Sequence, residues 1–391
     1  MVIRLLFAIL VWLAITSLVH YYIFHRAIDP LVSADSKTFA FSVMASLWGV
    51  TIVGFPIARA VPLRIRRLLE LLMFTWMGFA YLLMLVCTLT LPVSLGFQFV
   101  GHPETSLAVF IWGVTSVLAW RSVAKILGPE RLRYQVIPVQ KDLPPELEKL
   151  SAVVLSDVHV AGLVGARRMK RLTRRVNSLM PDFIFVTGDL VDGSVRQLRN
   201  DVLPLRELKA RCGIFYVTGN HEFYSHPKQW REFCQNELGW NVLSNDAKAV
   251  NVDGHRVNII GIEDRSWLRQ NNGLIRKDTR LDEAVQRVQS ADVGSALNIL
   301  LAHQPKDAVR VEQYPWIDVQ ISGHTHGGQF WPLHFFVYRD QTYNTGLYTI
   351  KNTKTKLYVS EGTGFWGPPM RLGTHCEISV LRFVGRKGVA D

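Results

Sequence analysis

Two histidines one residue apart give the sequence its clearest chemical feature. His324 and His326 follow an apolar run, within the stretch Ile321–Gln329, and glycines lie on both sides of the pair. Alternate side chains of an extended segment point to the same face, so an extended backbone would direct both imidazoles into one small volume. Such a pair can bind a metal ion. Because the same pattern also occurs in surface loops without a metal, it needs partners elsewhere in the chain.

Polar residues with related chemistry follow four other apolar runs. Each run is short and apolar, as expected of a buried strand. Ligands of α/β proteins gather at the carboxyl ends of strands, so we expect these polar side chains to converge. A helix cap, a turn or a buried hydrogen-bonded histidine would explain any one of them, but five in the same register favour a site. In chain order, the residues after the five runs are Asp157 with His159, Asp189, Asn220 with His221 and Glu222, His303, and His324 with His326.

The donor types indicate which ions such a site would hold. Carboxylate, amide and imidazole groups without a thiolate suit a pair of moderately hard ions: Mn²⁺, Fe²⁺/Fe³⁺ or Zn²⁺. The four cysteines lie far apart and form no C-x-x-C motif. They therefore indicate neither a disulfide framework nor a zinc knuckle.

The elements that must position these residues follow from the pattern after residue 150. Short β runs alternate with helical patterns up to about residue 238, and strand-rich segments follow. We therefore predict an α/β domain over residues 150–391, built from two packed sheets with helices outside. Residues 127–149 are polar and contain four prolines. They are expected to form a linker with at most one edge strand.

The first third of the chain is much more apolar. We predict a bundle of four transmembrane helices over residues 1–126, at about 5–24, 38–58, 71–91 and 105–124. The fourth window is short and requires Arg121 and Lys125 to extend to the interface. A cleaved signal peptide is the alternative for the first window. Three further spans and the lack of a small-residue cleavage site argue against it.

Basic residues in the short loops predict the orientation of these helices. Arginines occur between the second and third windows and after the fourth, whereas the third loop has no basic residue. The positive-inside rule then places both termini in the cytoplasm. We expect a multi-pass protein of a bacterial cell membrane, with its large C-terminal domain on the cytoplasmic side. The net charge of +12 is compatible with nucleic acid, an anionic membrane or a phosphate substrate, and does not choose among them.

The ordered motifs D-x-H, G-D, G-N-H-E, H and G-H-x-H resemble the calcineurin-like metallophosphoesterase superfamily, from about Leu150 to the C-terminus. The segments SDVH, TGDLVDG, VTGNHEFY, LAHQP, SGHTHGGQFWP and GTGFWGPPMR are most similar to its membrane-associated YkuE-like subgroup. The resemblance implies a two-sheet αββα sandwich and two metal ions. One ion would be held by Asp157, His159 and His326. The other would be held by Asn220, His303 and His324, with Asp189 bridging the two.

This ligand set implies a reaction. Two such ions generate a bridging hydroxide for in-line attack on phosphorus and neutralise the phosphoryl oxygens. His221, beside a metal ligand, is then the candidate general acid. Glu222 is either the partner that fixes this imidazole or a solvated carboxylate at a helix start. Arg371 is a candidate phosphate contact, with a structural salt bridge as the alternative, and Asp192 is a further candidate for substrate binding.

One departure from the superfamily bears on the substrate. Phosphoprotein phosphatases carry an arginine directly after the GDxxD segment, where this chain has Gly193, which argues against phosphoserine and phosphothreonine. A phosphodiester or pyrophosphate bond is expected instead, in a lipid-linked or nucleotide-linked amphiphile. Some membrane-associated members cleave the pyrophosphate of UDP-2,3-diacylglucosamine.

Other functions remain open. A nuclease or cyclic-nucleotide phosphodiesterase is the enzymatic alternative, although we expect no specific nucleic acid partner. A catalytically inactive scaffold would show degenerate ligands, and none is missing. Transporters and sensors usually have charged residues well inside their transmembrane helices, and the predicted spans have none there, which argues against such a role.

Membrane lipids are the expected partners, and two groups of residues bear on this. One is a basic helix, which is either a solvated face or a contact with anionic headgroups: Arg167, Arg168, Lys170, Arg171, Arg174 and Arg175. The other is a set of aromatic residues near the motifs, which either belong to the core or line an entrance for an acyl or prenyl chain: Trp267, Phe330, Trp331, Phe335, Phe336, Phe365 and Trp366.

Overall fold

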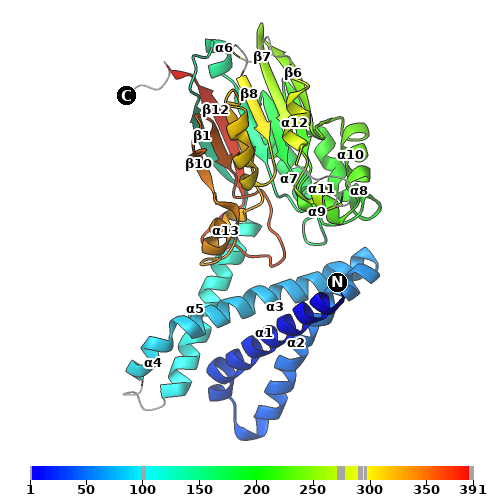
Figure 1. Ribbon diagram of the computed structural model, residues 1–391. Helices are drawn as coiled ribbons and strands as arrows, with labels where there is room; N and C mark the ends of the chain where they lie inside the picture. Colours follow the sequence, from blue (N-terminus) through cyan, green and yellow to red (C-terminus); the bar gives the residue numbers. More distant parts are fainter. Residues whose placement is uncertain (1, 98–102, 271–277, 289–293, 295–296, 387–391) are drawn as a thin grey trace. The chain divides into compact units, whose positions relative to one another are not determined.

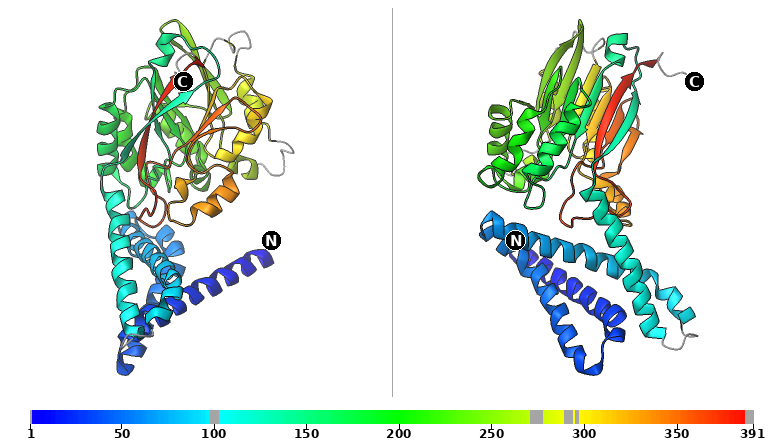
Figure 2. Two further views of the ribbon diagram at one scale, coloured as in Figure 1. Left: turned by 90° about the vertical axis from the view of Figure 1, so that its left-hand side faces the viewer. Right: turned by 180° about the vertical axis from the view of Figure 1, so that it is seen from behind.

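The computed structural model describes residues 2–97, 103–270, 278–288, 294 and 297–386 (Figures 1 and 2). The chain forms two compact units. The first comprises Met1–Leu127 together with Gly367–Leu372, and the second comprises Gly128–Trp366 and Gly373–Asp391. Each unit is described separately below.

Helices make up the first unit. Four of them are long and apolar enough to cross a membrane: α1 (Val2–Ile23), α2 (Lys37–Ala60), α3 (Leu63–Leu89) and α5 (Pro103–Leu127). A short helix, α4 (Leu91–Phe97), lies in the predicted third loop. The second loop is shorter than expected, because α3 begins at Leu63 and the arginines assigned to the loop lie within helices. The Arg66–Glu70 ion pair (2.6 Å) supports this early start, since side chains four residues apart meet on one helix face.

Two half-buried tryptophans of the first unit find hydrogen-bond partners inside it. The indole nitrogen of Trp76 donates to Nε2 of His20 (3.0 Å), and that of Trp112 donates to the carbonyl oxygen of Ala27 (2.6 Å). The segment Gly367–Leu372 also belongs to this body, since the backbone amide of Arg371 donates to the carbonyl oxygen of Ser122 (3.1 Å). A short piece of the C-terminal sequence is thus part of the helical unit.

Two six-stranded sheets form the second unit. The first has the order β1 (Arg131–Pro138), β12 (Glu377–Val384), β2 (Ser151–Leu155), β3 (Phe183–Thr187), β4 (Gly213–Val217), β5 (Asn241–Val242). The second has the order β10 (Gly346–Thr349), β11 (Lys356–Val359), β9 (Val319–Ser322), β8 (Leu297–Leu301), β7 (His255–Gly261), β6 (Asp246–Val252). Strands β2 to β5 run parallel, as do β7, β8, β9 and β11. The two-sheet α/β prediction is therefore confirmed.

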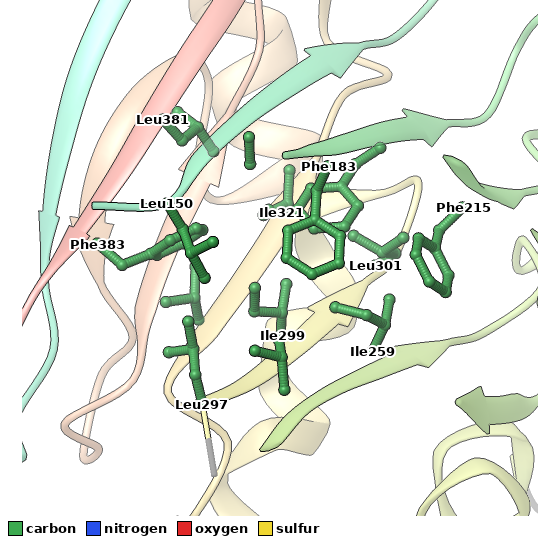
Figure 3. Close-up of a cluster of buried hydrophobic side chains, with 14 of the residues drawn as sticks. Leu150, Phe183, Phe215, Ile259, Leu297, Ile299, Leu301, Ile321, Leu381 and Phe383 are labelled. Atoms are coloured by element: carbon green, nitrogen blue, oxygen red, sulfur yellow. The ribbon is translucent and has the colours of Figure 1, made fainter. Parts of the chain in front are cut away.

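Alternating residues of the strands build the core between the sheets (Figure 3). Phe183 and Phe185 point inward from β3, with ring centroids 5.6 Å apart, and Ile299 and Leu301 point inward from β8. Successive side chains of a strand face opposite sides, so one face of each sheet supplies this layer. On the outer face of the second sheet, α12 (Arg280–Val285) packs with η6 (Pro305–Gln313) in a separate apolar cluster.

Helices connect the parallel strands of the first sheet in the predicted places. They are α7 (Ala166–Asn177) between β2 and β3, α8 (Val195–Val202) between β3 and β4, and α10 (Pro227–Asn236) between β4 and β5. Such crossovers bring the carboxyl ends of successive parallel strands to one edge of the sheet. The remaining short helices are α6 (Pro145–Glu148), α9 (Asn220–Tyr224), α11 (Ser266–Gln270) and α13 (His334–Gln341).

Residues 127–149 contain the one edge strand that the prediction allowed, and this strand is a full member of the first sheet. Strand β1 pairs in parallel with β12 along its whole length, from Arg131 opposite Glu377 to Pro138 opposite Val384. Ile137 and Val139 are fully buried in the core between the sheets. The segment is therefore an integral edge of the first sheet, because its apolar residues complete the core.

Candidate metal centre

The residues at the five strand ends converge. Their ligand atoms form three groups in which all members lie within 4.8 Å of one another. The groups are Asp157 with His159 and His326, Asp189 with His303 and His324, and His159 with Asp189 and His221. Because His159 and Asp189 each belong to two groups, the three form one continuous cluster.

Left-handed backbone positions these ligands. Asp157, His159, Asp189, His324 and His326 have φ angles of 52°, 49°, 51°, 69° and 50°. Non-glycine residues rarely adopt this conformation, and it concentrates at functional sites. The extended-segment explanation for the two neighbouring histidines is therefore wrong, because β9 ends at Ser322 and both histidines lie in the turn that follows. The turn sends His326 to the first group and His324 to the second.

The first group is assembled around Asp157. Nε2 of His326 lies 3.6 Å from Oδ1 of Asp157 and 3.0 Å from Nε2 of His159. The backbone amide of His324 lies 3.0 Å from both carboxylate oxygens of Asp157, and the hydroxyl of Ser156 also donates to this carboxylate. A Cβ atom on Gly323 would overlap the Asp157 carboxylate and the Ser156 hydroxyl. A glycine is thus required where the β9 turn approaches this ligand.

The second group is assembled around His303. Its Nδ1 lies 2.8 Å from the carbonyl oxygen of Thr187 and must donate to it, so the lone pair of the neutral imidazole is on Nε2. This Nε2 atom lies 3.2 Å from Oδ2 of Asp189, from Oδ1 of Asn220 and from Nδ1 of His324. Two imidazoles, a carboxylate and an amide oxygen therefore meet in one buried place. A cation satisfies such a set of electron pairs, so the residues present fit a metal ion.

The electrostatics of the second group agree with this donor set. Burial opposes ionisation of Asp189, but the imidazole of His303 and then those of His221 and His159 outweigh it and hold the pKa of the carboxyl well below its ordinary value. Burial and the neighbouring His303 lower the pKa of His324 to about 4. An ionised carboxylate beside a neutral imidazole is the form that binds a divalent ion.

Asp192 connects two histidines of the cluster. Its Oδ1 lies 3.0 Å from Nδ1 of His159 and also contacts Nδ1 of His221. Nδ1 of each ring is thereby occupied, and Nε2 of His221 points toward Oδ2 of Asp189 at 3.9 Å. Burial lowers the pKa of His221, but the charges of Asp189 and Asp192 outweigh it and raise the value to about 9. Asp192 is thus placed to orient two imidazoles.

Glu222 has a role that neither expectation described. The side chain is fully buried, so it is not a solvated carboxylate. Its two oxygens accept hydrogen bonds from four backbone amides, at 2.6–3.2 Å: those of Asp189, Leu190, Val191 and Gly219. The imidazole of His221 is held by Asp192 instead. Glu222 therefore fixes the turn that carries Asp189 against the turn that carries Asn220.

Two residues near the cluster, Asp264 and Gln329, were missed by sequence reasoning. Asp264 is fully buried beyond the end of β7 and accepts hydrogen bonds from Gln304 (2.6 Å) and the amide of Ser266 (2.7 Å). Its position after an apolar run is the same signal that identified the other strand ends. Gln329 and Trp366 form two hydrogen bonds, and the Trp366 ring lies edge-on to His221, 5.9 Å between centroids. No local pattern predicts that pair, because its members are 37 residues apart.

The remaining candidates are distributed over several environments. Arg371 is fully buried and lies in the segment that belongs to the first unit, so its proposed phosphate contact stays a prediction. Of the aromatic residues, Phe330 and Phe365 are buried, whereas Trp331, Phe335, Phe336 and Trp366 are exposed.

The basic helix α7 is not a uniformly solvated face. Arg168 forms an ion pair with Glu130 (3.2 Å), donates to the carbonyl oxygen of Thr363 (3.3 Å) and lies over the ring of Phe365. Its neighbours Arg167, Lys170, Arg171 and Arg174 are exposed.

Comparisons with known proteins agree with this site. Residues 150–328 match the family model described as calcineurin-like phosphoesterase. A bovine (Bos taurus) transmembrane protein with a metallophosphoesterase domain is 36% identical over 287 residues, which cover 71% of this chain and 61% of the relative. A metallophosphoesterase of Campylobacter jejuni is 33% identical, covering 65% of this chain and 64% of its own length.

The chain thus spans slightly less than two thirds of these two relatives. Metallophosphoesterase YkuE of Bacillus subtilis is 26% identical over 66% of this chain and 87% of its own length. The matched segment contains all seven predicted metal ligands, from Asp157 to His326. The second unit therefore contains a calcineurin-like metallophosphoesterase domain.

Proposed function

We propose that this protein is a membrane-anchored hydrolase that cleaves a phosphodiester or pyrophosphate bond with two divalent cations, Mn²⁺, Fe²⁺/Fe³⁺ or Zn²⁺. The observation that carries the proposal is the pair of ligand groups that share the buried cluster around Asp189. Asp157, His159 and His326 would hold one cation, and Asn220, His303 and His324 the other, with Asp189 between them. Bound there, the cations would activate water and neutralise charge on the phosphoryl oxygens.

Residues of the chain supply the rest of the reaction. His221 is our candidate general acid, since Asp192 occupies its Nδ1 and leaves Nε2 free to donate a proton to the leaving oxygen. The aromatic rings of Tyr224 and Trp366 lie beside the His221 ring, with centroids 5.3 and 5.9 Å away. These two rings restrict how a leaving group approaches the acid. Glu222 and Asp192 position other residues, and neither needs to touch the substrate.

The activity can be tested with the purified full-length chain and bis-p-nitrophenyl phosphate in the presence of Mn²⁺. Asp189→Ala and His324→Ala should abolish hydrolysis and reduce the metal content. Glu312→Ala, which removes an exposed carboxylate of the same domain, should change neither. Full activity in both ligand variants would contradict the two-metal proposal. Thermal unfolding of each variant shows whether it is folded.

We propose a lipid-linked or nucleotide-linked amphiphile as the substrate. Support comes from Gly193 in place of the arginine of phosphoprotein phosphatases, and from the four apolar helices in the same chain. A diacylated sugar nucleotide should be cleaved with a higher kcat/KM than its deacylated analogue. Preference for single-stranded DNA or a cyclic nucleotide in the same panel would favour the nuclease or cyclic-nucleotide phosphodiesterase alternative.

The catalytic domain is proposed to lie on the cytoplasmic side of the membrane. The arginines at the end of α2 and in the first turns of α3, together with the basic residues at the end of α5, support this orientation under the positive-inside rule. A reporter fused after Asp391 and expressed in a bacterial host should be inactive as periplasmic alkaline phosphatase and fluorescent as a cytosolic protein. The opposite pattern would invert the orientation.

A further inference from the structure

Exposed apolar side chains of the second unit are concentrated in one short segment. Eleven large hydrophobic residues of its described part are more than a third exposed, and five of them fall within residues 331–338. We call residues 331–338 the aromatic segment; its exposed members are Trp331, Leu333, Phe335, Phe336 and Tyr338. Phe335 and Phe336 are 65% and 70% exposed. Such a concentration on a soluble surface marks an interaction site.

The aromatic segment is attached directly to the loop of metal ligands. Gly328 has a φ angle of 87°, and a Cβ atom there would lie 2.5 Å from Cα of His334, the first residue of α13. Helix α13 therefore starts against the turn that carries His324 and His326. Gln329 lies between this turn and α13, and its side chain forms two hydrogen bonds with the backbone of Trp366.

Further exposed aromatic rings border the candidate general acid. Trp366 and Tyr224 are 53% and 65% exposed, and both have ring contacts with His221. Two exposed rings therefore lie beside a histidine of a site whose interior is polar. This combination suits a ligand with a phosphate head and an apolar remainder.

The connection of the chain identifies the partner of this surface. Trp366 is followed by Gly367, the first residue of the segment that belongs to the helical unit. Within that unit Pro368 and Met370 contact Gly78 of α3, one of the four helices that can cross a membrane. Trp366 is thus covalently tied, one residue away, to a body suited to a bilayer, and its two hydrogen bonds with Gln329 link it to the start of the aromatic segment. Trp, Tyr and Phe are also the side chains that favour the boundary between headgroups and acyl chains.

We propose that the aromatic segment inserts into the headgroup boundary of the lipid leaflet that holds the helices of this protein. The apolar rings enter the leaflet, while Arg339 and Asp340 of α13 remain with the headgroups. The metal centre then faces the lipid surface, and a phosphate-bearing amphiphile reaches it without leaving the bilayer. Membrane binding of such a segment increases with the apolar area that it buries. This contact does not depend on the proposed hydrolytic activity.

The test uses the full-length chain in phosphatidylglycerol–phosphatidylcholine nanodiscs, labelled with an environment-sensitive fluorophore (NBD) at Phe336→Cys. Cys212, the one native cysteine that is not buried, is replaced by serine for site-specific labelling. The control label is at Met180→Cys, an 84% exposed apolar position just before β3, at the opposite end of that strand from Asp189. Hydrolysis of bis-p-nitrophenyl phosphate by each labelled protein is recorded separately.

We expect the label at position 336 to emit at shorter wavelength than the control and to be quenched by nitroxide-bearing lipids. Emission like that of the control would overturn the proposal. A blue shift without quenching by the lipid nitroxides would overturn it too, because it places the label against protein. Loss of hydrolysis with retained lipid quenching would leave this contact standing and count only against the proposed function.

Discussion

Gln329 and Trp366 are joined by two hydrogen bonds between distant parts of the chain. The side-chain amide of Gln329 donates to the carbonyl oxygen of Trp366 at 2.8 Å, and its oxygen accepts from the backbone amide of Trp366 at 3.0 Å. The glutamine side chain thus pairs with this backbone as a neighbouring strand would. It ties the loop of metal ligands to the loop whose tryptophan lies beside His221.

Gln329→Leu keeps the size of the side chain but removes both hydrogen bonds. We expect kcat/KM for a phosphodiester to fall by up to about 30-fold, since each of the two lost hydrogen bonds costs about 1 kcal/mol and the Trp366 loop is released. Steady-state kinetics would measure this. Gln313→Leu, an exposed glutamine of the same unit, is the matched control. Equal kinetics in the two variants would show that the pair has no influence on the reaction.

Asp192→Asn should weaken metal binding while leaving the fold intact. The carboxylate orients His159, a predicted metal ligand, through Nδ1, and loss of such a supporting partner typically reduces metal affinity 10–100-fold. Isothermal titration of the metal-free protein with Zn²⁺ or Mn²⁺ would report the change. Asp253→Asn alters an exposed carboxylate and should bind metal like the unaltered protein. An unchanged affinity in Asp192→Asn would remove Asp192 from its positioning role.

Glu222→Gln should destabilise the second unit. The carboxylate accepts four backbone N–H groups, and the new amide nitrogen would face two of these donors. A loss of about 2 kcal/mol is expected, equivalent to a Tm decrease of roughly 4–8 °C for a domain of this size. Differential scanning fluorimetry with Glu207→Gln, an exposed glutamate, as the control would measure it. The same Tm for both variants would contradict the structural role.

Gly323→Ala should disrupt the first group of ligands. The added methyl group overlaps the carboxylate of Asp157, which three hydrogen bonds hold in place, so the ligand must move. We expect loss of part of the bound metal and at least a 10-fold lower kcat, measured by metal analysis and kinetics. Gly294→Ala adds the same methyl group in open space and serves as the control. Normal metal content in Gly323→Ala would show that the site tolerates the shift.

Chelation should lower the Tm of the second unit. The lone pairs around His303 are brought together by folding, so a bound cation stabilises the folded state relative to the unfolded chain. EDTA or a stronger chelator should reduce the Tm, and Mn²⁺ or Zn²⁺ should restore it. Asp189→Ala should show a much smaller response. A Tm that changes with neither the chelator nor the added metal would argue against cation binding at this cluster.

The sequence by itself determined the convergence of the ligands. Asp157, Asp189, Asn220, His303 and His324 each follow a short apolar run, and the carboxyl ends of parallel strands gather at one edge of each of the two sheets. Local composition likewise determined the apolar helices, since length and hydropathy decide whether a segment can span a bilayer. These features depend on neighbours within a few residues.

Only the tertiary structure decided how the ligands are held. The left-handed φ angles of five ligands, and the pairing of Asp192 with both His159 and His221, depend on contacts between separate strand ends. The position of β1 in the first sheet depends on Glu377–Val384, nearly 250 residues later. Such contacts form only when distant segments pack together. The residue types near one position do not indicate which distant segment will pack against it. The sequence therefore predicted which residues gather, and the fold determined which of them bind, orient or support.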